Sequence, residues 1–290
     1  MQFLKDLPVL VLGLGDSGLA MARWCARCGA GVTVWDSREN PPQAAALQAE
    51  APTARRIAAL PAVLGGDGGP RLVLKSPGLA PQDPLVAPLL EEARAAGIAV
   101  LGELDLFARA LADLQAERGY RPQLLAVTGT NGKTTTTAMT ALLVERAGRS
   151  VAMAGNIGPT LLDTLAARLS DLPAVWVLEL SSFQLEGGGH GVRGFEPDAA
   201  AVLNLTQDHL DWHGSMAAYA AAKARIFGSR AVMVVNADDP QVMAMVQAMT
   251  PAPPPGKAVK GKSKPVERSV LRFGLAAPQR PGDFGLGVEN

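Results

Sequence analysis

An apolar segment that runs into glycines, a lysine and threonines has the residue types needed to bind a phosphate. In "LLAVTGTNGKTTTT", residues 124–137, a predicted strand leads into a turn at 129–132 and then a predicted helix. The literal P-loop pattern fails because Val127 occupies its first glycine position. The context is nevertheless right, since glycines let the backbone turn its N–H groups inward and a helix N-terminus favours phosphate. Lys133 would reach the β- and γ-phosphates and Thr134 would hold Mg²⁺, so we predict a nucleoside triphosphate site.

A second segment matches the P-loop pattern literally but lacks its context. "GKAVKGKS", residues 256–263, has the spacing G-x-x-x-x-G-K-[ST]. Prolines precede it where a strand is needed, and Pro265 follows it where a helix is needed. We interpret this match as spurious and residues 251–267 as a solvated loop rich in Pro and Lys.

A glycine-rich turn near the start of the chain offers another phosphate site. "GLGDSG", Gly13 to Gly18, fits the dinucleotide fingerprint, follows a predicted strand and opens a predicted helix. Asp36 ends the next predicted strand, where an acid that binds ribose would lie. Three interpretations remain open: NAD(H), another nucleotide diphosphate, or a glycine turn needed only for packing. Because NAD beside a triphosphate site would be unusual, we favour a non-redox nucleotide.

Polar side chains follow three later predicted strands. Asn156 lies in "GNIG", Glu179 in "VLELSSFQL" and His209 in "LNLTQDHLDWH". Since ligands gather beyond the carboxyl ends of parallel strands, we expect these side chains to converge on Lys133. A carboxylate and an imidazole near a triphosphate indicate Mg²⁺ ligands. The alternatives are an exposed strand-end acid for Glu179 and a turn cap for His209.

Other candidate side chains carry a weaker signal. We interpret His190, in the glycine loop "GGGHG", as non-functional and His213 as a surface residue. Lys223 lies on a predicted helix, where most lysines are solvated. "DFG" at 283–285 is similar to a kinase motif, but no H-R-D loop accompanies it, so we reject it.

Composition and cysteine use limit the class of protein. Lys plus Arg equals Asp plus Glu at 27 each and aromatics are 4%, which disfavours nucleic acid and anionic membranes as partners. The apolar start is interrupted by Asp6 and Pro8, so we interpret it as a strand, and no segment approaches transmembrane length. Cys25 and Cys28 form a CxxC pair without nearby zinc ligands. We interpret both as reduced, which predicts a cytoplasmic protein.

The motifs require a scaffold of alternating strands and helices, which predicts parallel sheets. The first unit has predicted elements at 8–15, 17–29, 31–36, 71–78, 84–97 and 98–111. The second has strands at 124–128, 150–153, 175–180, 200–205 and 231–236 and helices from 133 and at 215–227. The polar stretch 113–123 predicts a boundary between a Rossmann-like domain, 1–115, and a P-loop-type α/β ATPase domain, 116–290. Little structure is predicted after "RSVLRFGL", so we expect the second domain to be incomplete.

Five segments resemble, in order, the central domain of the Mur ligases. They are "TGTNGKTT", "GNIG", "ELSSFQL", "LNLTQDHLDWHGSMAAYAAAKARIF" and "VNADDP". "GLGDSG", "WDSR" and "KSPG" resemble the uridine-nucleotide domain of the branch that adds D-glutamate, and "LELSSFQL" is similar to the version in that branch. The resemblance covers nearly the whole chain. It implies ATP-dependent ligation of D-glutamate to UDP-N-acetylmuramoyl-L-alanine in peptidoglycan synthesis, through an acyl phosphate.

The resemblance also implies roles for individual residues. Lys133, Lys223 and His209 would be catalytic. Thr134 and Glu179 would hold one Mg²⁺ and His209 a second, and Lys223, if carbamylated, would hold or orient Mg²⁺. The ATP-binding residues would be Thr128, Gly129, Thr130, Asn131, Gly132, Lys133, Thr134 and Thr135. The muramoyl-alanine part would contact Asn156, Ser181, Gln184 and Asp208, and the UDP part Asp16, Ser17, Ser37, Arg38, Ser76 and Gly78.

The chain also departs from the family pattern. The resemblance implies a third, C-terminal domain that this sequence does not reach, so we expect a truncated, monomeric polypeptide that does not turn over alone. Three competing hypotheses stand beside it: another Mur-type ligase such as folylpolyglutamate synthase, an NAD(P)-dependent oxidoreductase, and a non-catalytic nucleotide-binding module. The "SPG" loop of the first unit disfavours the first of these, and the second rests on the Gly13–Gly18 fingerprint and Asp36 alone.

Overall fold

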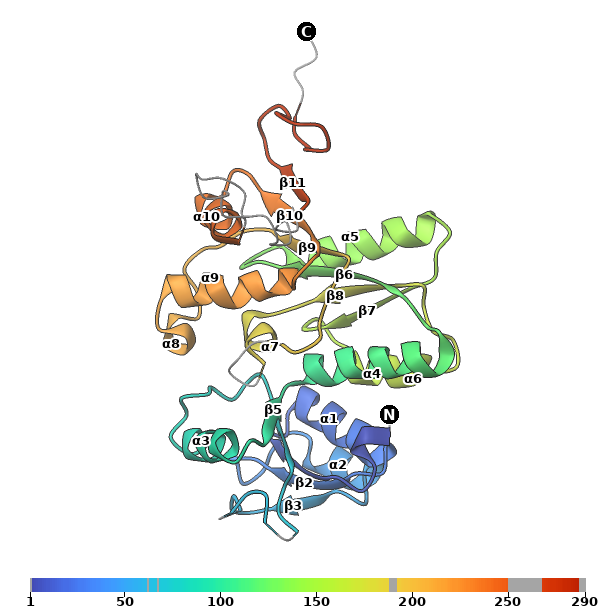
Figure 1. The fold of residues 1–290 in the computed structure, drawn as a ribbon, viewed down its shortest axis with the longest axis vertical. Helices are drawn as coiled ribbons and strands as arrows, with labels where there is room; N and C mark the ends of the chain where they lie inside the picture. Colours follow the sequence, from blue (N-terminus) through green and yellow to red (C-terminus); the bar gives the residue numbers. More distant parts are fainter. Residues whose placement is uncertain (1, 62, 67, 188–191, 250–267, 287–290) are drawn as a thin grey trace, which may run out of the picture.

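Each half of the chain forms a parallel β-sheet accompanied by helices (Figure 1). The computed structural model describes residues 2–61, 63–66, 68–187, 192–249 and 268–286. The two sheets confirm the predicted α/β class, a Rossmann-like unit followed by a P-loop-type unit. His190 and the segment 251–267, including the rejected match at 256–263, lie outside the described residues.

The first sheet has the strand order β3-β2-β1-β4-β5. All its strand pairs are parallel. From β1, the strands β2 and β3 extend the sheet on one side, and β4 and β5 extend it on the other side. Ligands of such sheets bind at the point where the direction changes, here between β1 and β4. Both strands are apolar and mostly buried, as expected for central strands of a covered sheet. The elements are η1 Gln2–Leu4, β1 Pro8–Leu12, α1 Asp16–Arg27, β2 Gly31–Trp35, α2 Ala44–Glu50, β3 Arg55–Ile57, β4 Leu72–Lys75, α3 Ala87–Ala95, β5 Ala99–Leu101 and α4 Glu103–Arg118.

The second sheet has the strand order β11-β10-β9-β6-β8-β7. It is also parallel, and β6 lies between β8 and β9. The loop after β6 therefore lies where strand addition changes direction. The elements are β6 Gln123–Thr128, α5 Lys133–Arg146, β7 Val151–Gly155, α6 Leu161–Arg168, β8 Val175–Glu179, α7 Ser182–Glu186, β9 Ala199–Val202, α8 Leu210–His213, α9 Met216–Ala224, η2 Arg225–Phe227, β10 Val232–Asn236, α10 Pro240–Met249 and β11 Val270–Phe273.

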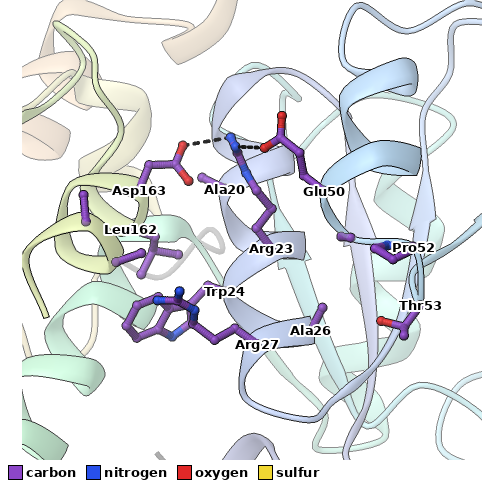
Figure 2. A pocket seen from close by; sticks show the side chains of 13 residues that line it. Ala20, Arg23, Trp24, Ala26, Arg27, Glu50, Pro52, Thr53, Leu162 and Asp163 are labelled. Carbon is purple, nitrogen blue, oxygen red and sulfur yellow. Dashed lines mark hydrogen bonds and ion pairs between the residues drawn. The ribbon is translucent and has the colours of Figure 1, made fainter.

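Helices α1, α4 and α6 join the two units, and Figure 1 shows α4 and α6 between the sheets. Arg23 of α1 pairs with Glu50 of the first unit and, at 3.0 Å, with Asp163 of the second. Figure 2 shows both pairs, whose residues belong to the lining of a cavity of about 640 Å³ formed by α1, residues 50–53 and α6. The units thus share an interface that is only partly filled.

The polar stretch 113–123 does not form a linker along its whole length. Residues 113–118 are the last turns of α4, which ends at Gly119 in the left-handed conformation, φ +68°. The predicted boundary at 115/116 therefore falls inside a helix that packs against α1 and α6. Charged residues cover the outer face of an amphipathic helix as readily as they fill a loop. The domain bounds 1–115 and 116–290 stay a prediction.

Candidate functional site

The loop between β6 and α5 is folded onto itself and onto the segment after β9. Lys133 Nζ donates to the carbonyl oxygens of Gly129 (3.1 Å) and Thr130 (2.9 Å). The N–H groups of Thr130 and Asn131 donate to the backbone oxygen (3.0 Å) and Oδ1 (2.8 Å) of Asn204. The first N–H groups of a helix lack intrahelical acceptors, so those that open α5 are the donors suited to a phosphate.

Thr134 and Glu179 meet at the carboxyl ends of the neighbouring strands β6 and β8. Thr134 Oγ1 donates to Glu179 Oε2 at 2.8 Å, and Asn156 Nδ2 donates to Oε1 at 3.1 Å. The close approach needs a glycine before Asn156, because a Cβ on Gly155 would lie 2.2 Å from the Glu179 carbonyl oxygen. Glu179 is 2% exposed, so the alternative of an exposed strand-end acid was wrong.

This pair of oxygen donors fits a magnesium ion bound with a triphosphate. Mg²⁺ takes one or two carboxylates from the protein and completes its shell with phosphate oxygens and water. Thr134 and Glu179 supply a hydroxyl and a carboxylate 2.8 Å apart beside a helix N-terminus. Within the described part of the chain, no group of three or more His, Cys, Asp and Glu side chains could hold a metal without such outside ligands.

Lys223 reaches the phosphate loop from α9. Its side chain is 2% exposed, and Nζ donates to Gly129 O (2.9 Å) and Thr128 Oγ1 (3.3 Å). Nζ also lies 4.7 Å from the ring centroid of Tyr219. Burial, together with the charge of Lys133, lowers the pKa of Lys223 to about 7. The alternative of a solvated helix lysine was wrong, and a neutral amine is accessible near pH 7.

His209 lies at the N-terminal end of α8, beside aromatic rings. It has φ +51°, and its Nε2 lies 3.3 Å from Asp208 Oδ2. Its ring centroid lies 4.7 Å from that of Phe183 and 6.2 Å from that of Tyr219. The His209 side chain makes no capping hydrogen bond to α8. Its assignment to a second Mg²⁺, like the substrate contact of Asp208, stays a prediction.

The side chain of His213 is buried, so its interpretation as a surface residue was wrong. Its side chain is 2% exposed. Nε2 lies 3.0 Å from Ser182 Oγ, and Nδ1 lies 3.8 Å from Glu186 Oε2. Burial lowers the pKa of His213, against the opposing charge of Glu186. The residue therefore holds α8 against α7 as a largely neutral imidazole.

Ser181 and Gln184 form a capping box at the start of α7. Ser181 Oγ accepts from the N–H of Gln184 at 3.2 Å, and Gln184 Oε1 accepts from the N–H of Ser181 at 3.0 Å. This exchange satisfies two donors that a helix start leaves open. The structure thus gives both residues a local structural role, and their predicted contact with the muramoyl-alanine part is untested.

In the first unit, Asp36 closes the glycine turn after β1. Asp36 Oδ2 accepts from the N–H of Leu14 at 2.6 Å and from Arg38 Nη2 at 2.8 Å, and Oδ1 accepts from Arg38 Nε at 2.8 Å. Burial acts to raise the pKa of Asp36, but the hydrogen bonds from Arg38 and Leu14 lower it to about 2. Both carboxylate oxygens are engaged within the protein, which leaves this acid poorly suited to bind an NAD ribose.

The residues predicted to hold UDP gather at the carboxyl ends of β1, β2 and β4. Asp16 opens α1 and accepts from Gln43 at 2.6 Å. Ser76 Oγ donates to the carbonyl oxygen of Gly13 at 3.0 Å. α1 approaches so closely that a Cβ on Gly18 would lie 1.9 Å from that same oxygen. The remaining predicted residues follow the same three strands: Ser17, Ser37, Arg38 and Gly78.

Several residues of the site were not singled out from the sequence. Asn204 holds the phosphate loop, and Tyr219 OH lies 3.2 Å from Thr130 Oγ1. Asn204 carried a detectable signal, since it follows β9 as Asn156 follows β7. Tyr219, which is 1% exposed, carried none, because a tyrosine on an alanine-rich helix is typical of an ordinary core residue.

Two further predictions from the sequence concerned the redox state of the cysteines and the length of the apolar segments. Neither Cys25 nor Cys28 forms a disulfide, and burial raises the pKa of each thiol. Among the described helices, none is both long and apolar enough to cross a membrane.

Comparisons with known proteins agree with this geometry. The model of the MurD-like N-terminal domain of Mur ligases matches residues 8–102, and that of the Mur ligase middle domain matches residues 127–268. The UDP-N-acetylmuramoylalanine–D-glutamate ligase of Albidiferax ferrireducens is 60% identical, and the alignment covers 99% of this chain and 54% of that protein. The protein of the same name from Burkholderia multivorans is 54% identical, with 97% and 53% covered. The chain spans about half the length of the curated relatives it matches.

A solved structure shares the fold. The UDP-N-acetylmuramate:L-alanyl-gamma-D-glutamyl-meso-diaminopimelate ligase of Neisseria meningitides superposes with a TM-score of 0.54 at 17% identity, covering 92% of this chain and 78% of that one. Fold and site together define a two-unit α/β protein with candidate sites at the carboxyl ends of its two parallel sheets. The chain belongs to the Mur ligase family, which confirms the resemblance in its sequence.

Proposed function

We propose that this protein is an ATP-dependent ligase that joins D-glutamate to UDP-N-acetylmuramoyl-L-alanine in peptidoglycan synthesis. The observation that carries the proposal is the contact of Thr134 with Glu179, beside Lys133 and the buried Lys223. It combines the groups that phosphoryl transfer needs: a phosphate-binding cation, magnesium ligands and a helix N-terminus. The names of the relatives that are 60% and 54% identical support the choice of substrates.

The reaction would use ATP to turn a carboxylate into an acylating group. The alanyl carboxylate oxygen attacks the γ-phosphorus, which releases ADP and forms an acyl phosphate. The amine of D-glutamate then attacks the acyl carbon, and phosphate leaves as the amide forms. Mg²⁺, in two ions, would neutralise charge on the transferring phosphoryl group.

The chain's own residues would bind and orient these groups. Lys133 would exchange the carbonyl oxygens of Gly129 and Thr130 for phosphate oxygens, since a lysine is a compact and mobile cation. Thr134 and Glu179 would hold the first ion and His209 the second. Lys223, whose pKa of about 7 leaves much of its amine neutral, would react with carbon dioxide to give a carbamate. The carbamate is an anion and would hold or orient Mg²⁺.

The first unit would bind the uridine diphosphate part. Asp16, Ser17, Ser37, Arg38, Ser76 and Gly78 all follow strands that meet at one edge of the sheet. We also infer a monomer in the cytoplasm, and the reduced state of Cys25 and Cys28 supports a reducing compartment. The oxidoreductase alternative is not favoured, because both oxygens of Asp36 bind Leu14 and Arg38.

Glu179→Gln tests the triphosphate site. Calorimetric titration of the chain with a non-hydrolysable ATP analogue, with and without Mg²⁺, should give one site whose affinity rises on adding Mg²⁺. In the variant, that gain should fall by about tenfold or more, because an amide is a far weaker Mg²⁺ ligand than a carboxylate.

Glu145→Gln is the matched control, since Glu145 is an exposed acid near the other end of the same helix. It should leave the Mg²⁺ gain unchanged. An equal Mg²⁺ gain in Glu179→Gln and in the unsubstituted chain would remove Glu179 from the metal site and weaken the ligase proposal.

A further inference from the structure

We propose that Lys75 is a positioning residue that ties the uridine-binding loop of the first unit to the helix that starts after His209 in the second. The inference rests on the proposed function, which assigns Ser76 and Gly78 to the UDP part of the substrate. Lys75 belongs to neither of the two nucleotide sites described above.

Lys75 is a buried cation that closes the loop following its own strand. It ends β4, and its side chain is 1% exposed. Nζ donates to the carbonyl oxygen of Leu79 at 2.7 Å and to that of Ser76 at 3.2 Å. An ammonium group out of water needs such oxygen partners. The shape of the loop 76–79 is therefore linked to the position of one charged group.

The same short segment contacts α8 across the interface. Lys75 Nζ lies 5.5 Å from the centroid of the Trp212 ring, a cation–π contact. Gln82 Nε2 donates to the carbonyl oxygen of Trp212 at 2.7 Å. α8 spans residues 210–213 and follows His209 directly, so both contacts act on the helix that carries a predicted Mg²⁺ ligand.

The surroundings show that these contacts are not part of a continuous packed core. A cavity of about 390 Å³ lies beside them, lined from both units by residues including Gln82, Arg94, Glu186, Trp212 and His213. Where two units do not pack continuously, individual polar contacts fix their relative positions.

Glu186, the acid whose charge acts on Lys75, also contacts two other side chains. The charge of Glu186 acts on Lys75, but Glu186 Oε1 lies 3.2 Å from Arg225 Nη1 and Oε2 lies 3.8 Å from His213 Nδ1. The partners bonded directly to Lys75 Nζ are thus the two loop carbonyl oxygens. Removing the ammonium would release the loop and the Trp212 ring together, while the triphosphate loop keeps its own contacts.

Lys75→Met tests this link, since methionine retains an apolar chain without the ammonium. Calorimetric titration with UDP-N-acetylmuramoyl-L-alanine should show binding about tenfold weaker than in the unsubstituted chain, as expected for lost charged hydrogen bonds. Affinity for the non-hydrolysable ATP analogue with Mg²⁺ should stay unchanged. Lys5→Met, at an exposed lysine, is the matched control and should change neither.

Tryptophan fluorescence gives a readout that a merely structural role would not move. Trp24, Trp35 and Trp176 are buried, whereas Trp212 is partly exposed at the interface. Saturation with the UDP compound should change the emission of the unsubstituted chain. The emission change should vanish in Trp212→Phe, which would assign the change to Trp212. It should also vanish in Lys75→Met when that variant is saturated with the UDP compound. Gln82→Ala, at an exposed position, should reduce it and serves if Lys75→Met does not fold.

The outcomes separate this inference from the proposed function. No binding of the UDP compound to the unsubstituted chain would overturn both. Binding to the unsubstituted chain, with equal affinity and equal emission change in Lys75→Met, would overturn the role of Lys75 and leave the ligase proposal standing. If Lys75→Met does not fold, an unreduced emission change in Gln82→Ala would likewise overturn the link.

Discussion

Lys75 and Lys223 illustrate how neighbours direct a buried lysine to different chemistry. Both are almost fully buried, and burial lowers the pKa of each, to about 8 and about 7. Lys133 lowers the pKa of Lys223 further, whereas Glu186 opposes the shift at Lys75. Lys223 thus has the more accessible neutral amine, which suits a covalent role, and Lys75 stays mainly charged near pH 7, which suits a tether.

The lowered pKa of Lys75 predicts a pH dependence of stability. Its pKa falls from 10.5 in the unfolded chain to about 8 in the fold, so the unfolded state binds more protons between these values. The free energy of unfolding should therefore rise with pH across this window, by up to about 1.4 kcal/mol per pH unit from this one group. Urea unfolding of Lys75→Met between pH 7.5 and about 9.5 should lack that share of the slope.

Lys5→Met again serves as the control, because an exposed lysine has nearly the same environment in both states. The prediction fails if Lys75→Met and the unsubstituted chain show parallel dependences on pH. That result would mean that water reaches Nζ in the folded state.

At the scale of single residues, the sequence identified the strand-end polar groups but not their partners. Lys133, Asn156, Glu179 and His209 were predicted to converge. Asn156 and Glu179 meet through a hydrogen bond, and Thr134 donates to the same carboxylate. Burial of Lys75 and His213 could not be predicted, because Lys75 contacts Trp212 across the two units and His213 contacts the separate helices α7 and α9. A sequence pattern describes one helix or strand at a time, so it does not predict contacts between elements that are far apart in the chain.

Helix ends account for much of the organisation at the scale of elements. Glu103, the first residue of α4, is 2% exposed and accepts the N–H of Leu162, at the start of α6, at 3.0 Å. Burial and the charge of Asp163 raise the pKa of Glu103 to about 7, although the Leu162 N–H and the Ser17 hydroxyl act against the shift. One buried carboxyl group thus links helix starts from both units.

Glu103 predicts a pH dependence of opposite sign. Its folded pKa of about 7 lies above the usual 4.5, so the folded state holds the proton in this window while the unfolded state has lost it. The contribution of Glu103 to the free energy of unfolding is largest below pH 4.5, and it is lost as the pH rises through about 7. Unfolding curves of Glu103→Gln between pH 5 and about 7.5 should lack this fall of up to about 1.4 kcal/mol per pH unit.

Glu117→Gln, at an exposed acid near the other end of α4, is the matched control and should keep the fall. If Glu103→Gln keeps it as well, Glu103 is ionised throughout this range, and the helix starts stabilise its charge fully.

Most strands and the long helices were predicted from sequence, but the short elements that shape the site were not. β1, β6 and β8 carry continuous apolar runs, which are typical of strands in a covered parallel sheet. α7 and α8 have five and four residues, too few to show a helical period. α7 depends on its capping box, and α8 depends on the contacts of its Trp212 and His213 rings with Phe183, so only the folded chain defines them.

At the scale of the whole molecule, the two proposed nucleotide sites lie on two separate sheets. The glycine turn after β1 and the phosphate loop after β6 each follow a strand at which strand addition changes direction. α1, α4 and α6 join the units on one side, and Lys75, Gln82 and Trp212 join them on the other. This arrangement suits a reaction that brings a uridine-linked carboxylate to a triphosphate.

The central claim is that the glycine turn of the first unit binds a uridine diphosphate compound and not a redox dinucleotide. The most direct test is calorimetric titration of this chain with UDP-N-acetylmuramoyl-L-alanine, and separately with NADH. We predict saturable binding of the UDP compound at one site and no binding of NADH. Binding of NADH alone would contradict this claim and favour the hypothesis of an NAD(P)-dependent oxidoreductase.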